Sequence, residues 1–274
     1  RKYGKPTDLK DFSRKAQIVN YDSHRAMMEA WNSKMWNSTS GLLLWMSHPA
    51  WPSMVWQIYS WDYETFGSFY GCRKACEPIH IQKNLDDQKV VVVNTSLKEI
   101  KGAKVIYEVY SLEGKSLFKR TSKLNVLANG LTECFVQDKP ISASGVYMER
   151  LILQDKRGKV ISINDYWQDN GEGDFQGFNA LEEASINCKL IRQKESQIQI
   201  ELQNTGAMPA LALKLNVREA DTDKRILPAY ASDGYFNLLP GEKRTVTVEY
   251  VSRGKVAISA EGYNLKRSRL LTLK

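Results

Sequence analysis

Six of the seven tryptophans in this chain lie between residues 31 and 61. The densest part reads LWMSHPAWPSMVWQIYSWD, an apolar run followed by an aromatic stretch broken by proline. Such residues at the mouth of a strand suit a sugar-binding cleft, because a pyranose ring has apolar C–H faces and a rim of hydroxyl groups. A tryptophan-rich core is the alternative, and it is favoured most for Trp31 and Trp36, which lie in a predicted helix.

Nucleophilic and acid–base chemistry has less support in the sequence. Three histidines lack a Ser or Cys partner at a recognisable nucleophile elbow: His24, His48 and His80. His48 stands out because it directly follows the apolar run, where barrel enzymes build their active sites. Four acidic residues near the aromatic stretch are expected to be solvated or helix-capping acids: Glu29, Asp62, Glu64 and Glu77.

Metal-binding patterns are incomplete. Cys72 and Cys76 are one helical turn apart and His80 follows, but a fourth ligand is missing and Pro78 interrupts the spacing. Buried free thiols are the better interpretation, and four Cys in 274 residues do not indicate a disulfide scaffold. Residues 169–174 are rich in oxygen ligands but do not match a calcium loop. We therefore predict no metal and no cofactor.

The composition is that of a globular protein of two or three domains, with 42% hydrophobic and 26% charged residues. The net charge is +8, but Lys and Arg are dispersed among apolar strand residues. This pattern is typical of solvated strand faces, so no nucleic-acid partner is predicted. No apolar run has the length of a membrane span. The chain begins RKYGKPTDLKDF, without Met or an apolar signal region, so we expect a piece of something longer or a processed chain.

The first 78 residues have an α/β pattern. Apolar residues at helical spacing predict a helix over residues 8–36, and a second helix is predicted over 63–76, where Pro78 stops it. Between them, the apolar residues 41–47 predict a short strand buried on both faces. Helix, buried strand, aromatic loop and helix follow one another as in an α/β barrel, of which only one strand is present.

From residue 79 onward the pattern changes to alternation with period two. Strands are predicted at 80–85, 89–94, 103–111, 116–124, 132–137, 145–154 and 160–167, then at 184–192, 197–203, 210–220, 235–238, 243–250 and 255–261. The two sets match at an offset of 110, which aligns Asn94-Thr95 with Asn204-Thr205. Two tandem immunoglobulin-like sandwiches follow from this repeat, joined by a linker at 165–180.

The predicted fold class is therefore mainly β: two tandem immunoglobulin-like β-sandwiches, preceded by the last α/β segment of an incomplete (β/α)8 barrel. The predicted domains are residues 1–78 for the barrel segment, 79–170 for the first sandwich and 171–274 for the second.

The front of the chain resembles glycoside hydrolase family 2, in its exo-β-glucosaminidase and β-mannosidase branches. The combination of Trp45, Trp51-Pro52, a following helix and Pro78-Ile79-His80 is fairly specific, and plant-type endo-β-mannosidases look similar over 15–82. Further residues carry the resemblance: Lys15-Ala16-Gln17, Tyr21, Arg25, Glu29, Ala50, Ser53, Trp56-Gln57, Asp62, Phe69-Tyr70-Gly71, Lys74-Ala75, Glu77, Ile81-Gln82 and 90–94. The remainder resembles the sandwich domains that follow the barrel in that family, with low motif specificity.

The resemblance implies a retaining β-glycosidase that acts on a β-linked glycan, with a general acid/base Glu and a nucleophilic Glu on earlier barrel strands. Both carboxylates are expected upstream of residue 1, so no catalytic residue is assigned and the chain alone is expected to be inactive. Substrate contacts are predicted for Trp45, His48 and Trp51. Trp56 and Trp61 are expected to pack beneath the cleft.

Other functions remain open at this point. Tandem sandwiches can form a non-catalytic carbohydrate-binding module or a structural module, although neither explains the first 78 residues. The buried strand at 41–47 needs neighbouring strands, so a further predicted partner is the remainder of the barrel, in the same polypeptide or in a separate chain. A glycan-degrading parent is expected in the periplasm or outside the cell.

Overall fold

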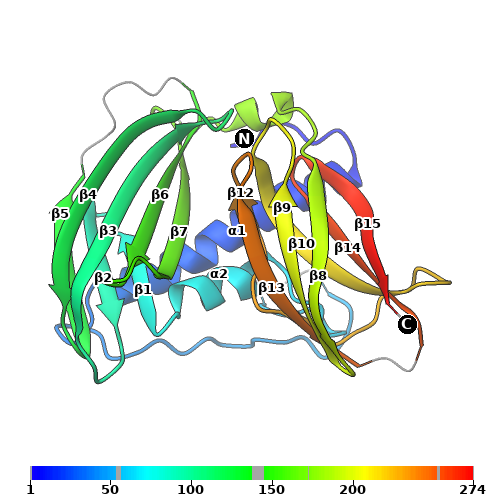
Figure 1. Ribbon diagram of the computed structural model, residues 1–274, viewed down its shortest axis with the longest axis horizontal. Coiled ribbons are helices and arrows are strands. Elements are labelled where there is room, and N and C mark those ends of the chain that lie inside the picture. Colours follow the sequence, from blue (N-terminus) through cyan, green and yellow to red (C-terminus); the bar gives the residue numbers. More distant parts are fainter. Residues whose placement is uncertain (1, 54–56, 138–144, 172, 252–253, 274) are drawn as a thin grey trace. The chain divides into compact units, whose positions relative to one another are not determined.

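The computed structural model describes residues 2–53, 57–137, 145–171, 173–251 and 254–273 (Figure 1). The chain forms two compact units. Unit 1 comprises Arg1–Gly4, Asp22–Leu44 and Gly71–Asn179, and unit 2 comprises Lys5–Tyr21, Trp45–Tyr70 and Ala180–Lys274. Each unit contains a β-sandwich. The predicted domain boundaries at residues 78 and 170 stay a prediction.

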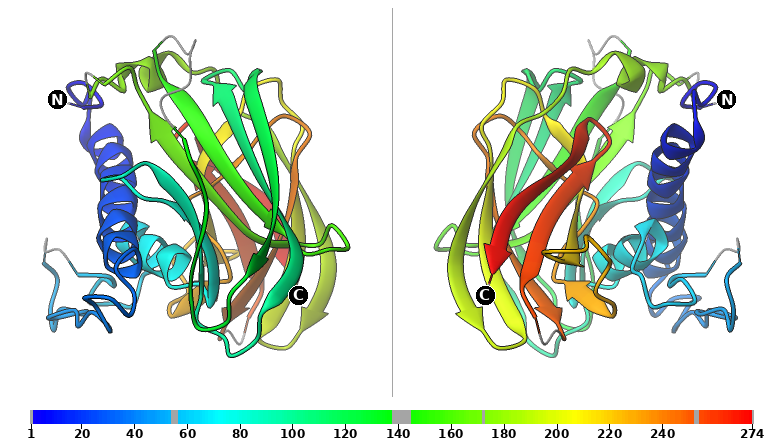
Figure 2. Two further views of the ribbon diagram at one scale, coloured as in Figure 1. Left: turned by 90° about the vertical axis from the view of Figure 1, so that its left-hand side faces the viewer. Right: turned by 90° about the vertical axis from the view of Figure 1, so that its right-hand side faces the viewer.

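The sandwich of unit 1 consists of two antiparallel sheets, in the strand orders β1-β2-β5 and β4-β3-β6-β7 (Figures 1 and 2). Its strands are β1 (Ile79–Lys83), β2 (Lys89–Asn94), β3 (Ile100–Ser111), β4 (Ser116–Val126), β5 (Gly130–Val136), β6 (Tyr147–Gln154) and β7 (Val160–Gln168). Alternate residues of facing strands, such as Val92, Val105 and Leu151, fill the core between the sheets. A buried Lys83–Glu149 ion pair of 2.9 Å lies in this unit, and the Tyr107 hydroxyl donates to Glu149.

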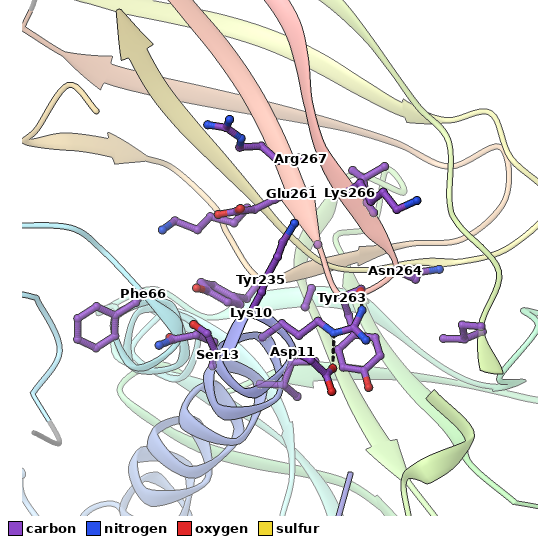
Figure 3. A pocket seen from close by; sticks show the side chains of 18 of the residues that line it. Lys10, Asp11, Ser13, Phe66, Tyr235, Glu261, Tyr263, Asn264, Lys266 and Arg267 are labelled. Atoms are coloured by element: carbon purple, nitrogen blue, oxygen red, sulfur yellow. Dashed lines mark hydrogen bonds and ion pairs between the residues drawn. The ribbon is translucent and has the colours of Figure 1, made fainter. Parts of the chain in front are cut away.

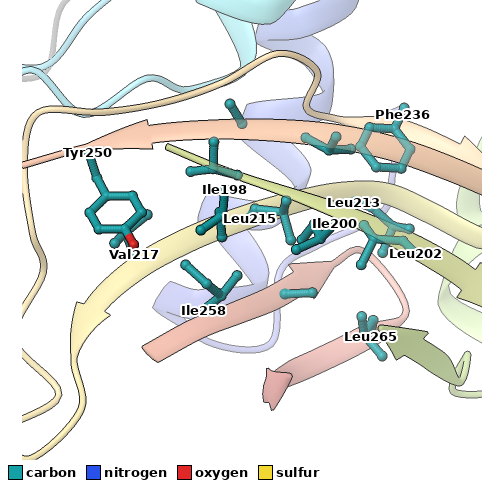
Figure 4. Packing of buried hydrophobic residues seen from close by; sticks show 14 of the residues in the cluster. Ile198, Ile200, Leu202, Leu213, Leu215, Val217, Phe236, Tyr250, Ile258 and Leu265 are labelled. Carbon is teal, nitrogen blue, oxygen red and sulfur yellow. The ribbon is translucent and has the colours of Figure 1, made fainter. Parts of the chain in front are cut away.

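The sandwich of unit 2 has the sheet orders β11-β13-β9-β8 and β12-β10-β14-β15. Its strands are β8 (Ile186–Lys194), β9 (Gln197–Asn204), β10 (Ala210–Glu219), β11 (Ala229–Ala231), β12 (Phe236–Leu238), β13 (Lys243–Tyr250), β14 (Val256–Gly262) and β15 (Leu265–Leu273). Ile200, Leu213 and Ile258 belong to its core (Figure 4). The prediction of a mainly β chain with two immunoglobulin-like sandwiches is confirmed, although β11 and β15 were missed.

The internal repeat has a structural counterpart in two buried asparagines. Asn94 donates to the carbonyl oxygens of Lys98 and Leu127 at 2.9 and 2.8 Å. Asn204, 110 residues later, donates to the carbonyl oxygens of Met208 and Leu238 at 2.8 and 2.9 Å. Each carboxamide oxygen also accepts from the backbone two residues onward. The same side chain thus closes the same turn in both sandwiches, because a buried loop carbonyl needs a donor.

Two helices precede the sandwiches in sequence. Helix α1 spans Leu9–Asn32 and α2 spans Gly67–Ala75, close to the predicted helices. The Asp8 carboxylate caps α1 by accepting from the backbone N–H of Asp11 at 2.7 Å. Gly67 begins α2 against α1, where a Cβ atom would lie 2.2 Å from the Gln17 carbonyl oxygen, so only glycine fits. In the described part of the chain, neither helix is long and apolar enough to cross a membrane.

The predicted buried strand at 41–47 is wrong. These residues adopt no regular secondary structure, and the Leu43 side chain is 96% exposed. Met46 has a φ of 63°, in the left-handed region that extended strands do not use. Among the described residues no strand pairs with this segment, and an extended segment without neighbours leaves its backbone groups without hydrogen bonds. The apolar pattern therefore had no sheet in which to form a strand.

The segment predicted as a linker, residues 165–180, is partly built into unit 1. It includes the end of β7 and a short 3-10 helix, Gln176–Ala180. Phe178 is buried, stacks on Tyr3 at 5.6 Å between ring centroids, and meets Trp167 edge-on at 5.0 Å. Aromatic contacts hold Phe178 in unit 1, so the segment predicted as a linker is partly a structured element.

Candidate functional site

The three predicted substrate-contact residues lie on one aromatic segment of unit 2. Trp45 is 83% exposed and Trp51 is 69% exposed, while His48 is half-buried between them in sequence. Exposed indole rings are unusual on a globular surface and are available for stacking against a ligand. Trp56 lies outside the described residues. Trp61 is 48% exposed, so the expectation that it packs beneath a cleft is wrong.

His48 is held in place by two contacts. Its ring stacks on the Tyr63 ring at 4.6 Å between centroids with an interplanar angle of 15°. Its Nε2 lies 3.2 Å from the Trp61 carbonyl oxygen, which can only accept, so Nε2 carries the proton. Nδ1 is then the acceptor in the neutral ring, and it has no partner among the described residues. His48 can therefore accept a hydrogen bond from a ligand hydroxyl.

The segment that carries Trp61 and Tyr63 is a tight turn. The Tyr63 N–H donates to the Ser60 carbonyl oxygen at 3.0 Å, and the Ser60 N–H donates to the Glu64 carbonyl oxygen at 3.1 Å. Tyr63 adopts a φ of 64°, which costs on the order of 1 kcal/mol for a residue with a side chain. The turn directs the Tyr63 ring toward His48, so the strained backbone conformation of Tyr63 accompanies the stacked pair.

Charged residues from the second sandwich hold both ends of this turn. Arg225 binds Asp62 at 2.7 Å and Glu64 at 2.6 Å, and Lys214 on β10 makes a further ion pair with Glu64. Burial acts to raise the pKa of both carboxyls. For Asp62, the Ser60 hydroxyl and Arg225 outweigh burial and lower the pKa. For Glu64, Lys214 and Arg225 outweigh burial and lower the pKa. The two acids are ionised anchors of the turn.

This finding corrects the expectation that Asp62 and Glu64 are solvated or helix-capping acids. It also argues against a general-acid role, because a catalytic acid needs a raised pKa and these carboxyls have lowered ones. Sequence reasoning missed Lys214 and Arg225, which lie at least 150 residues from their partners. No local pattern carries a signal for such pairs.

Glu29 was also misassigned as a solvated or capping acid. In unit 1 its carboxylate is buried and accepts three hydrogen bonds, from His80 Nε2 at 2.9 Å, Asn164 Nδ2 at 2.7 Å and the Tyr166 hydroxyl at 2.9 Å. Asn164 and Tyr166 lie on β7, so Glu29 fastens α1 to the first sandwich. All three hydrogen bonds reach Oε1, and a buried carboxylate that accepts from protein donors in this way is typical of a structural role.

His80 lies between two carboxylates, because its Nδ1 is also 3.4 Å from Glu77. Burial alone would lower the pKa of His80, but hydrogen bonds and negative charge from Glu29 and Glu77 raise it above the usual 6.5. Burial likewise opposes ionisation of Glu77, yet His80 and Lys74 lower the pKa of Glu77 to about 2. Glu77 is thus an ion-paired residue, and the solvated or capping role expected for it is wrong.

The described residues contain no cluster of three or more His, Cys, Asp or Glu arranged to hold a metal ion. Both ring nitrogens of His80 face carboxylates, so the Cys72, Cys76 and His80 pattern does not converge on a metal. All four cysteines are free, and burial raises the pKa of the Cys72 thiol to about 11. Cys76 is exposed, so the prediction of a buried thiol holds for Cys72 alone of this pair.

The exposed aromatic segment of unit 2 offers indole rings of the kind that line small-molecule sites. The known proteins that this chain resembles are carbohydrate-active enzymes. Residues 164–265 match the family model described as the exo-β-D-glucosaminidase Ig-fold domain. The chain is 27% identical to the exo-β-D-glucosaminidase of Arthroderma benhamiae, over 97% of this chain and 32% of that protein. It is 28% identical to the mannosylglycoprotein endo-β-mannosidase of Lilium longiflorum, over 96% of this chain and 34% of that protein.

Solved structures give the same result. The crystal structure of the Amycolatopsis orientalis exo-chitosanase CsxA superposes with a TM-score of 0.89 and 27% identity, covering 98% of this chain and 35% of that chain. The β-D-mannosidase of Dictyoglomus thermophilum shares the fold, with a TM-score of 0.73. The chain is similar to the C-terminal part of glycoside hydrolase family 2 enzymes, in the exo-β-glucosaminidase and β-mannosidase-like branch. It spans about a third of the length of these relatives.

Proposed function

We propose that this chain is the C-terminal part of a retaining β-glycosidase that breaks down a β-linked glycan, of the exo-β-glucosaminidase or β-mannosidase type. The observation that carries the proposal is the similarity to the A. orientalis exo-chitosanase, which extends over 98% of this chain at a TM-score of 0.89. That similarity includes the aromatic segment as well as the sandwiches. A purely structural module would have no need of exposed indole rings.

In this proposal the nucleophile and the general acid/base belong to a barrel that this chain completes. This assignment is supported by the carboxylates of Glu29, Asp62 and Glu64, which are bound by protein donors or cations and are therefore not free to act as the nucleophile or the general acid/base. The exposed apolar residues Leu43 and Trp45 support the need for a barrel partner, in the same polypeptide or in a separate chain. The chain alone would then be inactive.

Trp45, His48 and Trp51 would contact the sugar. Trp45 would provide the apolar floor for one pyranose face, because its indole ring is almost fully exposed. His48 would accept a hydrogen bond from a ring hydroxyl through Nδ1, while Nε2 stays on the Trp61 carbonyl oxygen. Trp51 would supply a second aromatic surface. Arg225 would act on the sugar only through the turn that it anchors.

Aryl β-glycoside assays test the proposal. The parent enzyme with a complete barrel should hydrolyse a β-glucosaminide or a β-mannoside, and the 274-residue chain should not. In the parent, Trp45→Ala should raise KM or lower kcat by at least about tenfold, the scale of one lost aromatic contact. Trp31→Ala, a change at another exposed tryptophan, is the matched control and should have little effect. Hydrolysis by the chain alone would contradict the placement of the catalytic carboxylates.

A further inference from the structure

Unit 2 contains a cavity of about 590 Å³ that the proposed function does not use. It is lined by the first half of α1, by Glu64 and Phe66, and by the outer face of the sheet that contains β10 and β14 (Figure 3). Lys214 and Glu261 belong to this outer face, since their neighbours Leu213 and Ala260 point into the core. A cavity of this volume is in the range of small-molecule sites.

One wall of the cavity is a stripe of polar residues on α1. Lys10, Ser13, Arg14 and Gln17 recur at helical spacing, so they lie on one face of the helix. Arg14 is fixed by Asp11 at 2.7 Å and by the Tyr263 carbonyl oxygen at 2.7 Å. Lys10 and Ser13 are exposed and have no hydrogen-bond partner among the residues that the structure describes. This wall therefore offers an unused ammonium group and an unused hydroxyl group.

The opposite wall offers an aromatic ring and a carboxylate. Tyr235 has a φ of 58° and packs on Tyr21 and Tyr70 at 6.3 and 5.8 Å between ring centroids. Its hydroxyl has no partner within the described ranges, and burial, followed by the charges of Glu261 and Glu64, raises its pKa well above 10. The phenol therefore remains a donor. Glu261 accepts from Asn216 at 2.9 Å through one oxygen, and its second oxygen is available.

The cavity lining balances charge, because it carries five basic and five acidic side chains. Several of them are already paired, as Arg14 is with Asp11, Lys214 with Glu64 and Lys266 with Glu183. A balanced lining gives a simple ion little net attraction. The same lining offers hydrogen-bond donors and hydrogen-bond acceptors beside the aromatic face of Tyr235. This combination suits a ligand with many hydroxyl groups and apolar C–H faces.

We propose that this cavity binds a short neutral oligosaccharide, which packs against Tyr235 and hydrogen-bonds to Lys10, Ser13 and Glu261. The site comes from unit 2 alone and is separate in sequence from the exposed tryptophans of 45–61. The proposal draws its ligand class from the cavity walls, so it does not require the chain to take part in hydrolysis.

Isothermal titration of the 274-residue protein with the neutral trimer of N-acetylglucosamine tests this site. We expect saturable binding in the wild type. Ser13→Trp should abolish it, because an indole at this exposed helix position fills the cavity without removing any core contact. Ser23→Trp places the same side chain at an exposed α1 position outside the cavity, and it should bind as the wild type does. Glu261→Gln, which keeps the side-chain shape, should weaken binding about tenfold.

Absence of saturable binding, or binding that Ser13→Trp leaves unchanged, would overturn the proposal. A parallel titration of Trp45→Ala separates the two sites. Binding lost in Trp45→Ala and kept in Ser13→Trp would place the sugar on the aromatic segment, which overturns the cavity site and leaves the proposed glycosidase function standing. Binding lost only in Ser13→Trp supports the cavity, whatever the outcome of the hydrolysis assays on the parent.

Discussion

Replacing Glu29 by alanine should destabilise unit 1 severely. The carboxylate is 4% exposed and accepts hydrogen bonds from His80, Asn164 and Tyr166 at 2.7–2.9 Å. Its removal leaves the cationic ring of His80 buried with Glu77 as its remaining carboxylate, at 3.4 Å. Breaking a buried ion pair from one side costs about 3–5 kcal/mol, because the other charge loses both its partner and its solvent.

Glu29→Gln separates charge from shape. The amide keeps the volume and one acceptor oxygen, and the ring of His80 can lose its proton, so we expect a smaller cost of about 1–2 kcal/mol. Glu99→Ala is the control in the same unit, since Glu99 is half-exposed and, within the described part of the chain, its ion pair is with the exposed Lys101; it should cost less than about 1 kcal/mol.

Hydrogen exchange measured along a urea series reports the two units separately. In Glu29→Ala, amide protection in α1 from residue 22 onward and in β7 should fall by roughly a hundredfold or more, since 1.4 kcal/mol corresponds to a factor of ten. Unit 2 strands serve as the internal reference. A cost below about 1 kcal/mol for Glu29→Ala, or equal costs for the alanine and glutamine variants, would refute the view that the buried charge holds α1 to the sandwich.

Three further predictions concern His80, Arg225 and Asn204. The raised pKa of His80 adds stability that is fully present below pH 6.5 and is lost as pH rises through the higher folded-state value. The lowered pKa of Glu77 adds stability that is present above pH 4.5 and is lost as pH falls toward about 2. Unfolding of unit 1 measured from about pH 2 to 9 should show the resulting maximum, and His80→Gln should remove its alkaline side. Arg225→Ala should cost about 1 kcal/mol, because Arg225 is half-exposed, and should speed amide exchange at residues 58–64; unchanged exchange there would exclude the anchoring role. Asn204→Ala removes the donor of one buried and one partly buried carbonyl and should cost about 2–4 kcal/mol in chemical unfolding of unit 2. A near-neutral result would show that water replaces the amide.

The sequence predicted the sandwiches well because strand alternation is a local property. Residues 89–94 were assigned with both ends correct, and Asn94 and Asn204 aligned across the repeat before their shared turn was visible. The misses have local causes too. The β15 strand reads LKRSRLLTL and exposes most of its residues, so it lacks the apolar alternation that identifies a strand. The three-residue β11 is too short to show a period.

The site residues were less predictable, because burial and pairing depend on distant parts of the chain. Trp45 and His48 were singled out by residue type, by their place at or after an apolar run and by the family resemblance, and their role as substrate contacts stays a prediction. Glu29 was read as a solvated acid because its helix offers no sign of a partner, yet the residues that bind it lie 51, 135 and 137 positions away. The apolar run at 41–47 was read as a buried strand, although burial requires neighbours that no single segment can supply.

The anchoring of the aromatic segment changes the role that the second sandwich can have. Residues 57–66 have no helix or strand of their own to fix Trp61, Tyr63 and His48. Hydrogen bonds within the turn set its local shape, but Arg225 and Lys214 are the cations that hold its two carboxylates. Because loops carry ligand contacts only as accurately as their scaffold holds them, a change in the sandwich at Arg225 should reach the sugar through the turn. The sandwich would then contribute to substrate positioning without touching the substrate, and that contribution would appear as an altered KM in the parent enzyme.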